Sequence, residues 1–205
     1  VYMKYARYLS TQERRETWEE MIVRNKNMHI ENFPKLSKEI ESAYKLVSDK
    51  KVLPSMRSLQ FAGAAIKQTP SRIYNCAYLP IDDYRAFSEV MFLLLGGTGV
   101  GYSVQRHHVE SLPSITKPTK RRRYLVGDSI EGWADCIKML MKAYFCGRPE
   151  PEFDFTGIRP KGALLITSGG KAPGAEPLKD CVHNIKRILD RKENGEQLST
   201  LEVHD

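Results

Sequence analysis

Cys76 is the residue whose surroundings point most directly to chemistry. It lies in the run 74–79, after a short loop and at the start of a β-rich stretch. A helical pattern follows, and then the glycine-dense segment 96–102. A thiol at a strand end that faces a glycine turn can meet a small polar substrate where backbone is exposed. The alternative interpretation is a buried structural cysteine, which is common in folded proteins.

The glycine segment 97–101, Gly-Thr-Gly-Val-Gly, does not fit a dinucleotide-binding fingerprint. That fingerprint follows a strand and opens a helix, whereas here a helical pattern precedes the glycines and a strand pattern follows them. The segment also lacks the Lys-Ser or Lys-Thr pair of a phosphate-binding loop. The sequence therefore predicts a tight helix-to-strand turn where backbone comes close to a ligand or a neighbour.

Positive charge is a second feature with chemical meaning. The formal net charge is +7, and five basic residues cluster between Lys117 and Arg123. Such a cluster attracts phosphate, on a nucleic acid or on a nucleotide; the other interpretation is a solvated surface loop. Tyr124 is the one aromatic residue beside the run, which argues against an extended groove for single strands, because such grooves need stacking platforms.

The remaining composition favours a cytoplasmic protein. No apolar run approaches the roughly 18 residues of a membrane span, so we expect no membrane segment. Residues 1–15 are polar with charges of both signs, so no signal peptide is expected. The four cysteines lack the Cys-x-x-Cys spacing of a zinc site, and they are too few for a disulfide scaffold. Neighbouring His107 and His108, expected in or just after a strand, would point to opposite faces and share no metal.

Periodicity and capping patterns place the elements around these residues. Ser10 and Glu13 form a capping-box pattern that predicts a helix from about Thr11 to Arg24. The further helices are expected from Pro34 to about residue 47, over 84–95, from 128 or 129 to about 145 and over 177–192. Extended segments are expected over 59–63, 75–79, 101–106 and 163–167, with a loop over 111–123 and a further element beginning near 198.

This alternation of strands and helices predicts an α/β fold, a sheet or a barrel. We expect a helical segment over residues 1–53 and a mixed α/β segment over 54–205. A further element begins near residue 198, so only part of the sheet is expected in this sequence. An incomplete sheet leaves an edge strand with unpaired backbone groups, which needs another strand to pair with. The pattern therefore favours a chain that is completed by another polypeptide.

Several motifs occur in a specific order along nearly the whole chain. They are Leu-Pro-Ser-Met-Arg-Ser-Leu at 53–59, Asn75-Cys76, Gly-Gly-Thr-Gly-Val-Gly-Tyr-Ser-Val at 96–104, Val-Gly-Asp-Ser-Ile-Glu-Gly-Trp at 126–133, and Ile-Arg-Pro-Lys-Gly at 158–162 with Gly-Gly-Lys-Ala-Pro-Gly at 169–174. Together they resemble the N-terminal part of the catalytic chain of ribonucleotide reductases. The sequence is most similar to the adenosylcobalamin-dependent (class II) type.

The resemblance implies a fold and a reaction. The family fold is a ten-stranded α/β barrel preceded by a helical segment, of which this chain would hold the first part. The family replaces the ribose 2′-hydroxyl with hydrogen through a thiyl radical, and two further cysteines supply electrons as they form a disulfide. By motif position Cys76 is one of those two, and a thioredoxin-like dithiol would reset the pair. Cys136, Cys146 and Cys181 match no catalytic position and are interpreted as structural.

The resemblance also implies binding residues. Ser58, Asn75 and Gly99 match positions near the ribonucleotide substrate. Residues at positions that bind a deoxynucleoside triphosphate effector are Asp83, Arg106, Arg123, Ser168, Gly169 and Lys171. The helices expected over 84–95 and 129–145 match the dimer contact of dimeric members, so we expect a homodimer of the complete unit. Adenosylcobalamin would be bound mainly by the rest of the enzyme.

The leading hypothesis is therefore an N-terminal component of a ribonucleotide reductase. It would contribute one reducing cysteine and the effector site, while the radical cysteine would lie on a C-terminal partner polypeptide. Two alternatives stay open. One is a basic nucleic-acid-binding module built around residues 117–123, and the other is a regulatory fragment that binds nucleotides without catalysis.

Overall fold

The computed structural model describes residues 2–165 and 170–205, which divide into two compact units. The first unit ends at Asn75, and the second comprises Cys76–Leu165 and Gly170–Asp205. The boundary expected between residues 53 and 54 falls inside the first unit. No helix in the described ranges combines the length and the apolar character needed to cross a lipid bilayer.

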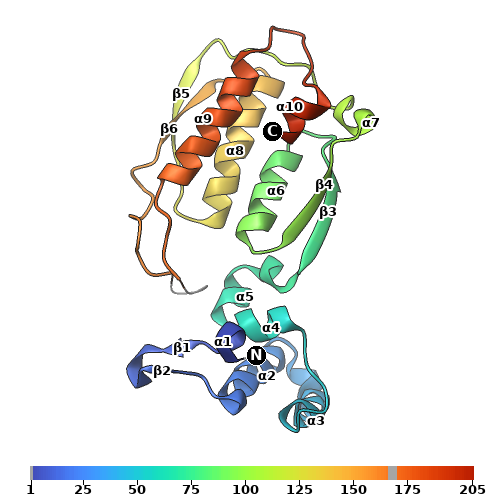
Figure 1. The fold of residues 1–205 in the computed structure, drawn as a ribbon, viewed down its shortest axis with the longest axis vertical. Coiled ribbons are helices and arrows are strands. Elements are labelled where there is room, and N and C mark those ends of the chain that lie inside the picture. Colours follow the sequence, from blue (N-terminus) through green and yellow to red (C-terminus); the bar gives the residue numbers. More distant parts are fainter. Residues whose placement is uncertain (1, 166–169) are drawn as a thin grey trace. The chain divides into compact units, whose positions relative to one another are not determined.

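The first unit is mainly helical (Figure 1). Its elements are α1 (Tyr2–Tyr5), β1 (Tyr8–Leu9), η1 (Ser10–Gln12), β2 (Arg14–Arg15), α2 (Trp18–Asn32), η2 (Pro34–Leu36), α3 (Ser37–Ser48), α4 (Met56–Phe61), α5 (Ala64–Gln68) and η3 (Pro70–Ile73). The helix expected after Pro34 is confirmed as η2 and α3. The extended piece expected over 59–63 is wrong, because the Ser55 hydroxyl accepts from Ser58 N and caps α4 there.

The first long helix begins later than the sequence predicts. Thr17 and Glu20 form the capping box, with the Thr17 hydroxyl accepting from Glu20 N and the Glu20 carboxylate accepting from Thr17 N. The pattern at Ser10 and Glu13 was the wrong choice of cap. Glu13 has a left-handed φ of 50° and lies in the turn between β1 and β2, where a helix cannot continue.

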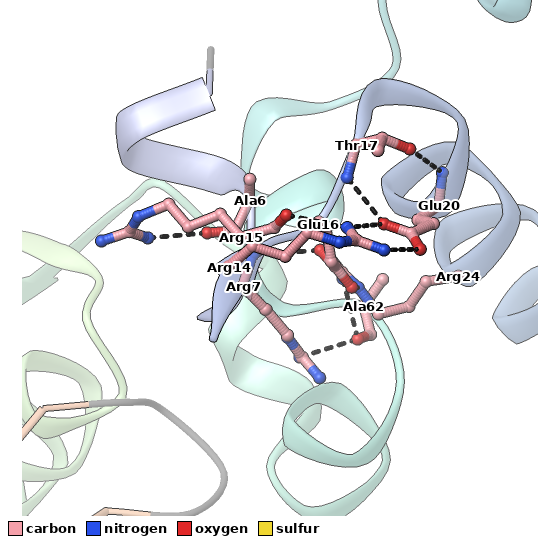
Figure 2. Close-up of polar contacts among 9 residues, drawn as sticks. All are labelled: Ala6, Arg7, Arg14, Arg15, Glu16, Thr17, Glu20, Arg24 and Ala62. Carbon is pink, nitrogen blue, oxygen red and sulfur yellow. Dashed lines mark hydrogen bonds and ion pairs between the residues drawn. The ribbon is translucent and has the colours of Figure 1, made fainter. Parts of the chain in front are cut away.

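A buried carboxylate holds this N-terminal hairpin in place (Figure 2). The Glu16 side chain is 7% exposed and accepts from Arg24 Nε at 2.7 Å and Arg24 Nη2 at 2.8 Å. Burial opposes its ionisation, but hydrogen bonds from Arg24 and from Arg7 N keep the pKa of Glu16 below its ordinary value. Arg7 and Arg24 also both donate to the Ala62 carbonyl oxygen, which ties the hairpin to the end of α4.

The second unit contains, among its described residues, two β-α-β segments and three further helices, α7, α9 and α10 (Figure 1). Its elements are β3 (Cys76–Pro80), α6 (Ala86–Leu95), β4 (Gly99–Ser103), α7 (Arg106–Val109), β5 (Arg121–Leu125), α8 (Ile130–Phe145), β6 (Glu150–Asp154), α9 (Glu176–Asp190) and α10 (Thr200–His204). The strands pair in parallel, β3 with β4 and β5 with β6. Each pair is joined by a crossover helix, α6 or α8, as parallel pairing requires.

Apolar helix faces meet in one core of this unit. Ile137, Leu140 and Tyr144 of α8 pack in the same buried cluster as Leu178 and Leu189 of α9. Both helices, expected from 128 or 129 to about 145 and over 177–192, are confirmed. The α/β class is confirmed as well. The ten-stranded barrel stays a prediction, because the described strands form separate two-stranded pairs.

Other local predictions for this unit were less accurate. The run 121–125 is strand β5 rather than loop, and the sequence did not reveal β6. His107 and His108 lie in the short helix α7 with ring centroids 4.0 Å apart, so the prediction of opposite strand faces is wrong. Leu164 forms an isolated bridge with Lys171, while the end of the strand expected over 163–167 lies outside the described residues.

Candidate functional site

The Cys76 thiol lies on an open face of the β3–β4 pair. Cys76 is opposite Gly99 in the parallel register, and Tyr78 is opposite Gly101. Side chains alternate along a strand, so these four residues share one face. Cys76 is exposed, and the two glycines place no side chain beside it. The structure therefore brings two predicted site residues, Cys76 and Gly99, directly together.

Tyr78 covers the middle of this face. Its side chain is 67% exposed, and a methyl group added at Gly101 would meet its Cδ2 atom at an ordinary contact distance of 3.8 Å. On the opposite face, Leu79 packs against the apolar core of the second unit. The core fixes the strand from behind and leaves the thiol face accessible.

The Asn75 side chain is held within the first unit. Its Oδ1 atom accepts a hydrogen bond of 3.0 Å from Arg57 Nε, in the first turn of α4. The guanidinium of Arg57 lies over the Phe61 ring, 5.4 Å from its centroid, and Arg72 lies over the same ring at 5.4 Å. Arg57 and Arg72 are residues that the sequence analysis did not single out, because their role depends on contacts 11 to 18 residues away in the chain.

Ser58 occupies a different environment from the one its predicted role suggests. It is 3% exposed, and its hydroxyl accepts a 2.7 Å hydrogen bond from Asn25 Nδ2. His29 Nε2 lies 3.3 Å from the same oxygen, and burial lowers the pKa of His29. Tyr44 donates to Asn25 and completes this buried polar group. The substrate contact of Ser58 stays a prediction.

Ser71 is a further polar residue that the sequence analysis missed. Its Oγ atom is buried and has no hydrogen-bond partner among the described residues. Most buried hydroxyls in folded proteins are paired, so Ser71 is an exception among the described residues. The signal was present in the sequence as a hydroxyl in the loop five residues before Cys76.

Two predicted effector residues lie beyond the carboxyl ends of β3 and β4. Those strands end at Pro80 and Ser103, which are register partners, and Asp83 and Arg106 each follow three residues later. They are thus at the opposite end of the pair from Cys76. Five-residue strands separate the two ends by about 13 Å at roughly 3.3 Å per residue.

Asp83 is engaged by its neighbour Arg85. Arg85 Nε donates to Asp83 Oδ1 at 2.8 Å and Arg85 Nη2 donates to Oδ2 at 3.1 Å. The same Oδ1 atom accepts from Arg85 N. The Arg85 side chain therefore holds the pKa of Asp83 below its ordinary value, although partial burial acts in the other direction. This carboxylate is ionised at neutral pH and can accept from a ligand hydroxyl.

Arg123 lies elsewhere in the second unit. It is on β5 and pairs with Asp154 of β6, which raises the pKa of Arg123. The two residues line an open hollow of about 520 Å³, together with Glu152, Phe153, Phe155, Thr156 and Lys179. Figure 1 shows β5–β6 and β3–β4 on opposite sides of the helices α6, α8 and α9. The structure thus does not bring Arg123 beside Asp83.

Much of the basic cluster is neutralised by acidic partners. Arg121 Nε lies 3.2 Å from Glu150, and Arg121 Nη1 lies 3.9 Å from Glu152. Lys117 Nζ lies 3.9 Å from Glu193 Oε2 and also donates to the Asp190 carbonyl oxygen at 3.3 Å. A surface that binds nucleic acid needs cations available to phosphates. The pairing therefore weakens the alternative of a nucleic-acid-binding module.

The other predicted residues and cysteines are distributed as follows. Lys171 is exposed, and its backbone forms an isolated antiparallel β-bridge with Leu164. Ser168 and Gly169 lie outside the described residues. Cys136 is fully buried, and burial raises the pKa of its thiol to about 12. Cys181 is partly buried in the same core, with its pKa raised for the same reason. In the described ranges, no group of three or more His, Cys, Asp and Glu side chains could hold a metal ion.

Comparisons with known proteins point to one family, although no family model matches the sequence. An adenosylcobalamin-dependent ribonucleoside-triphosphate reductase of Euglena gracilis is 30% identical over 173 residues, which cover 80% of this chain and 24% of the relative. A probable enzyme of the same name from Dictyostelium discoideum is 27% identical and matches 85% of this chain and 26% of the relative. The enzyme of Lactobacillus delbrueckii is 23% identical, with coverages of 98% and 36%.

A solved structure shares the fold. The crystal structure of a B12-dependent (class II) ribonucleotide reductase matches 100% of this chain and 38% of its own, with a TM-score of 0.83 and 22% identity. The chain thus spans between about a quarter and two fifths of the proteins it matches. In sequence and in fold, it is similar to a portion of the adenosylcobalamin-dependent, class II ribonucleotide reductases.

Proposed function

We propose that this chain is the N-terminal component of a ribonucleotide reductase and supplies one of its two reducing thiols. The observation that carries the proposal is the exposed Cys76 thiol beside Gly99 on β3–β4, in a chain similar to enzymes named ribonucleoside-triphosphate reductases. A glycine neighbour leaves room for a ribose next to the sulfur. Asn75 and Ser58 are the further residues assigned to the substrate.

The reaction balances with two thiols. The C2′–O bond of the ribose breaks and the oxygen leaves as water, while a C2′–H bond forms. Cys76 and a second cysteine each give up one electron and one proton as they form a disulfide. A thioredoxin-like dithiol then reduces that disulfide by exchange. The second reducing cysteine and the radical cysteine would be supplied by the C-terminal polypeptide.

Adenosylcobalamin is the cofactor named for the relatives, and it would supply the radical to the complete enzyme. We assign no residue of this chain to its binding. The proposed role of Cys76 is to lie close to the ribose and to supply one of the two electrons for its reduction. The first strand of a ten-stranded barrel would then be β3.

The effector site is assigned to the other end of the same strand pair. Asp83 and Arg106 offer one ionised carboxylate and one cation beyond the ends of β3 and β4, suited to a nucleotide with hydroxyl and phosphate groups. Arg123 and the loop with Ser168, Gly169 and Lys171 would relay effector identity to the substrate base. Two distinct sites, one at each end of the strand pair, are the first requirement of allosteric coupling, and the loop that contains Lys171 would be the element that changes shape.

A homodimer of the complete unit is proposed to form through α6 and α8. These helices pack against each other, and a hollow of about 450 Å³ lies between Ser88, Glu89, Phe92 and Leu93 of α6 and Glu131, Ala134, Asp135 and Lys138 of α8. A second copy of the same pair would fill such a hollow in a two-fold arrangement.

Replacement of Cys76 by serine in the complete assembly tests the proposal. Cys76→Ser should lower ribonucleotide turnover at least about 100-fold, because an alcohol cannot form the disulfide. Binding of deoxynucleoside triphosphates should be unchanged. Cys146→Ser, which replaces another exposed cysteine, is the matched control and should retain turnover. Full turnover by Cys76→Ser would remove this thiol from the mechanism and favour the regulatory fragment.

A salt titration separates the remaining alternative. Binding of DNA by a nucleic-acid module falls steeply as salt rises from about 50 to 200 mM. The proposed reductase component should instead prefer free deoxynucleoside triphosphates to DNA.

A further inference from the structure

A hydrogen bond next to the reducing thiol fixes the orientation of one amide. Arg57 Nε lies 3.0 Å from Asn75 Oδ1, and Asn75 immediately precedes Cys76 in the chain. The Asn75 side chain is otherwise exposed. This contact links the first turn of α4 to the residue that leads into β3.

The chemistry of the guanidinium decides which way the amide points. Arginine carries five N–H donors and no acceptor. The Asn75 oxygen must therefore face Arg57, because the amide NH2 group would repel it. With the oxygen occupied, the NH2 group and its two hydrogens are directed away from Arg57. The group that this asparagine presents on the side away from Arg57 is therefore a donor.

Packing keeps Arg57 in the geometry that this bond needs. Phe61 lies four residues further along α4, so its ring and the Arg57 side chain share one face of the helix. The ring is 8% exposed, and the Arg57 guanidinium lies over it at 5.4 Å. A guanidinium that is stacked on an aromatic ring is already held in one orientation. Its side chain therefore loses less conformational entropy when it forms a further hydrogen bond.

We propose that Arg57 is a positioning residue that orients the Asn75 amide so that its NH2 group donates to an oxygen of the ribonucleotide. The proposal rests on the proposed function. The oxygens of a nucleotide that accept hydrogen bonds are those of its phosphates, its sugar and its base carbonyls. Arg57 itself need not touch the substrate.

Ribonucleotide binding by variants of the complete assembly tests this role. Arg57→Met should raise the Kd and the KM for the ribonucleotide about fivefold to tenfold, the loss expected for one misdirected hydrogen bond, with kcat changed less than about twofold. Arg57→Lys keeps a donor and should recover most of the affinity. Asn75→Asp keeps an oxygen toward Arg57 but has no amide hydrogens, so it should bind at least as weakly as Arg57→Met.

A double variant separates this role from general packing. If Arg57 acts through Asn75, Arg57→Met combined with Asn75→Ala should bind no more weakly than Asn75→Ala alone. Losses that multiply, or unchanged binding by Arg57→Met or by Asn75→Asp, would overturn the proposal. Arg14→Met removes another positive charge of the same unit, one paired with Glu20, and should leave the Kd unchanged. An unmodified assembly that binds no ribonucleotide would contradict the proposed function itself, whereas normal binding with an unaffected Arg57→Met would contradict the role of Arg57 alone.

Discussion

The two β-α-β segments of the second unit share a topology and differ in what their open faces carry. Each consists of two five-residue parallel strands joined by a helix. The face of β3–β4 that holds Cys76 carries Tyr78 and two glycines, with no charged side chain on either strand. The corresponding face of β5–β6 carries alternating arginines and acids, from Arg121 opposite Glu150 to Arg123 opposite Glu152.

This difference shows that the chemistry resides in the side chains and not in the topology. On β5–β6 the arginines and the acids form ion pairs with one another, so the charges of this face already have partners. On β3–β4 the glycines leave backbone and thiol exposed, so the face is open to a ligand. The same framework thus produces one structural face and one candidate reaction face.

The largest expected effect comes from closing the open face. Gly99→Val would place a branched side chain directly beside Cys76, since neighbouring strands lie about 4.8 Å apart. We expect turnover of the complete assembly to fall about 100-fold, because displacement of a substrate by about 1 Å has that effect. Alkylation of Cys76 by iodoacetamide should slow as well, which can be followed by mass spectrometry.

Gly101→Ala is the matched control for that variant. Its methyl group would meet Tyr78 and the Ala77 carbonyl oxygen at 3.8 and 3.9 Å, which are ordinary contacts. Alkylation of Cys76 should therefore be close to normal. If Gly99→Val left turnover and alkylation unchanged, the face would not be where the substrate lies.

The next largest effect concerns the stability of α8, the crossover helix between β5 and β6. Gly132 lies in the first turn of α8, and a Cβ atom there would lie 2.4 Å from the Gly127 oxygen and 2.7 Å from its Cα atom. Gly132→Ala should therefore lower the free energy of unfolding of this unit by about 1–3 kcal/mol. Urea denaturation followed by circular dichroism measures this loss.

Gly157→Ala provides the comparison for Gly132→Ala. Its added methyl group would lie 3.4 Å from the Val126 carbonyl oxygen and 3.7 Å from Leu125, which leaves room for it. Both variants add one methyl group to a glycine, and they differ in the space that is available for it. Equal stabilities would show that α8 can shift away from Gly127 at little cost.

The smallest expected effect is the part of the pH dependence that comes from two carboxylates of β6. Burial opposes ionisation of Glu150, but Lys186 and Arg121 hold its pKa below the ordinary 4.5. Thr156 and Arg123 likewise lower the pKa of Asp154 from 3.8. Both carboxylates thus stabilise the fold above those values, and the stabilisation is lost as the pH falls below about 4.5 toward the lower folded pKa values.

Urea midpoints measured between about pH 6 and 3 test this expectation. Glu150→Gln should lower the stability at pH 6 by about 1 kcal/mol and flatten the profile. Gln105 near β4 has no titratable group, and Gln105→Glu serves as a surface control that should leave the profile below pH 4.5 nearly unchanged. A profile that stays equally steep in Glu150→Gln would place the pH dependence elsewhere in the unit.

The elements that the sequence predicted well are those with long apolar periodicity. Ser129, one of the two expected start positions, caps α8, and α9 buries Leu178 and Leu189 within its expected range. The start of α2 was misplaced, because two hydroxyl-x-x-Glu patterns lie seven residues apart and the unchosen one at Thr17 is the cap. Capping patterns are local, and the choice between them is made by the hairpin that β1 and β2 form.

The candidate site was predicted in part. Cys76 and Gly99 were selected from sequence and are register partners, while their functional roles stay predictions. Arg123 was grouped with Asp83, but β5 lies on the other side of the helices. The contact of Arg57 with Asn75 was not foreseen, because nothing in an arginine's local surroundings reveals a partner 18 residues away.

The amino-acid sequence alone determined the helices of the core, the strand that begins at Cys76, and the ordered motifs that indicate the family. These features depend on short-range periodicity and on residue identity. The tertiary structure decided that the thiol lies on an open face and that the arginines of β5 are paired with acids. Both depend on strand pairing between segments more than 20 residues apart, such as Cys76 with Gly99 and Arg121 with Glu150, and no local pattern encodes such a register.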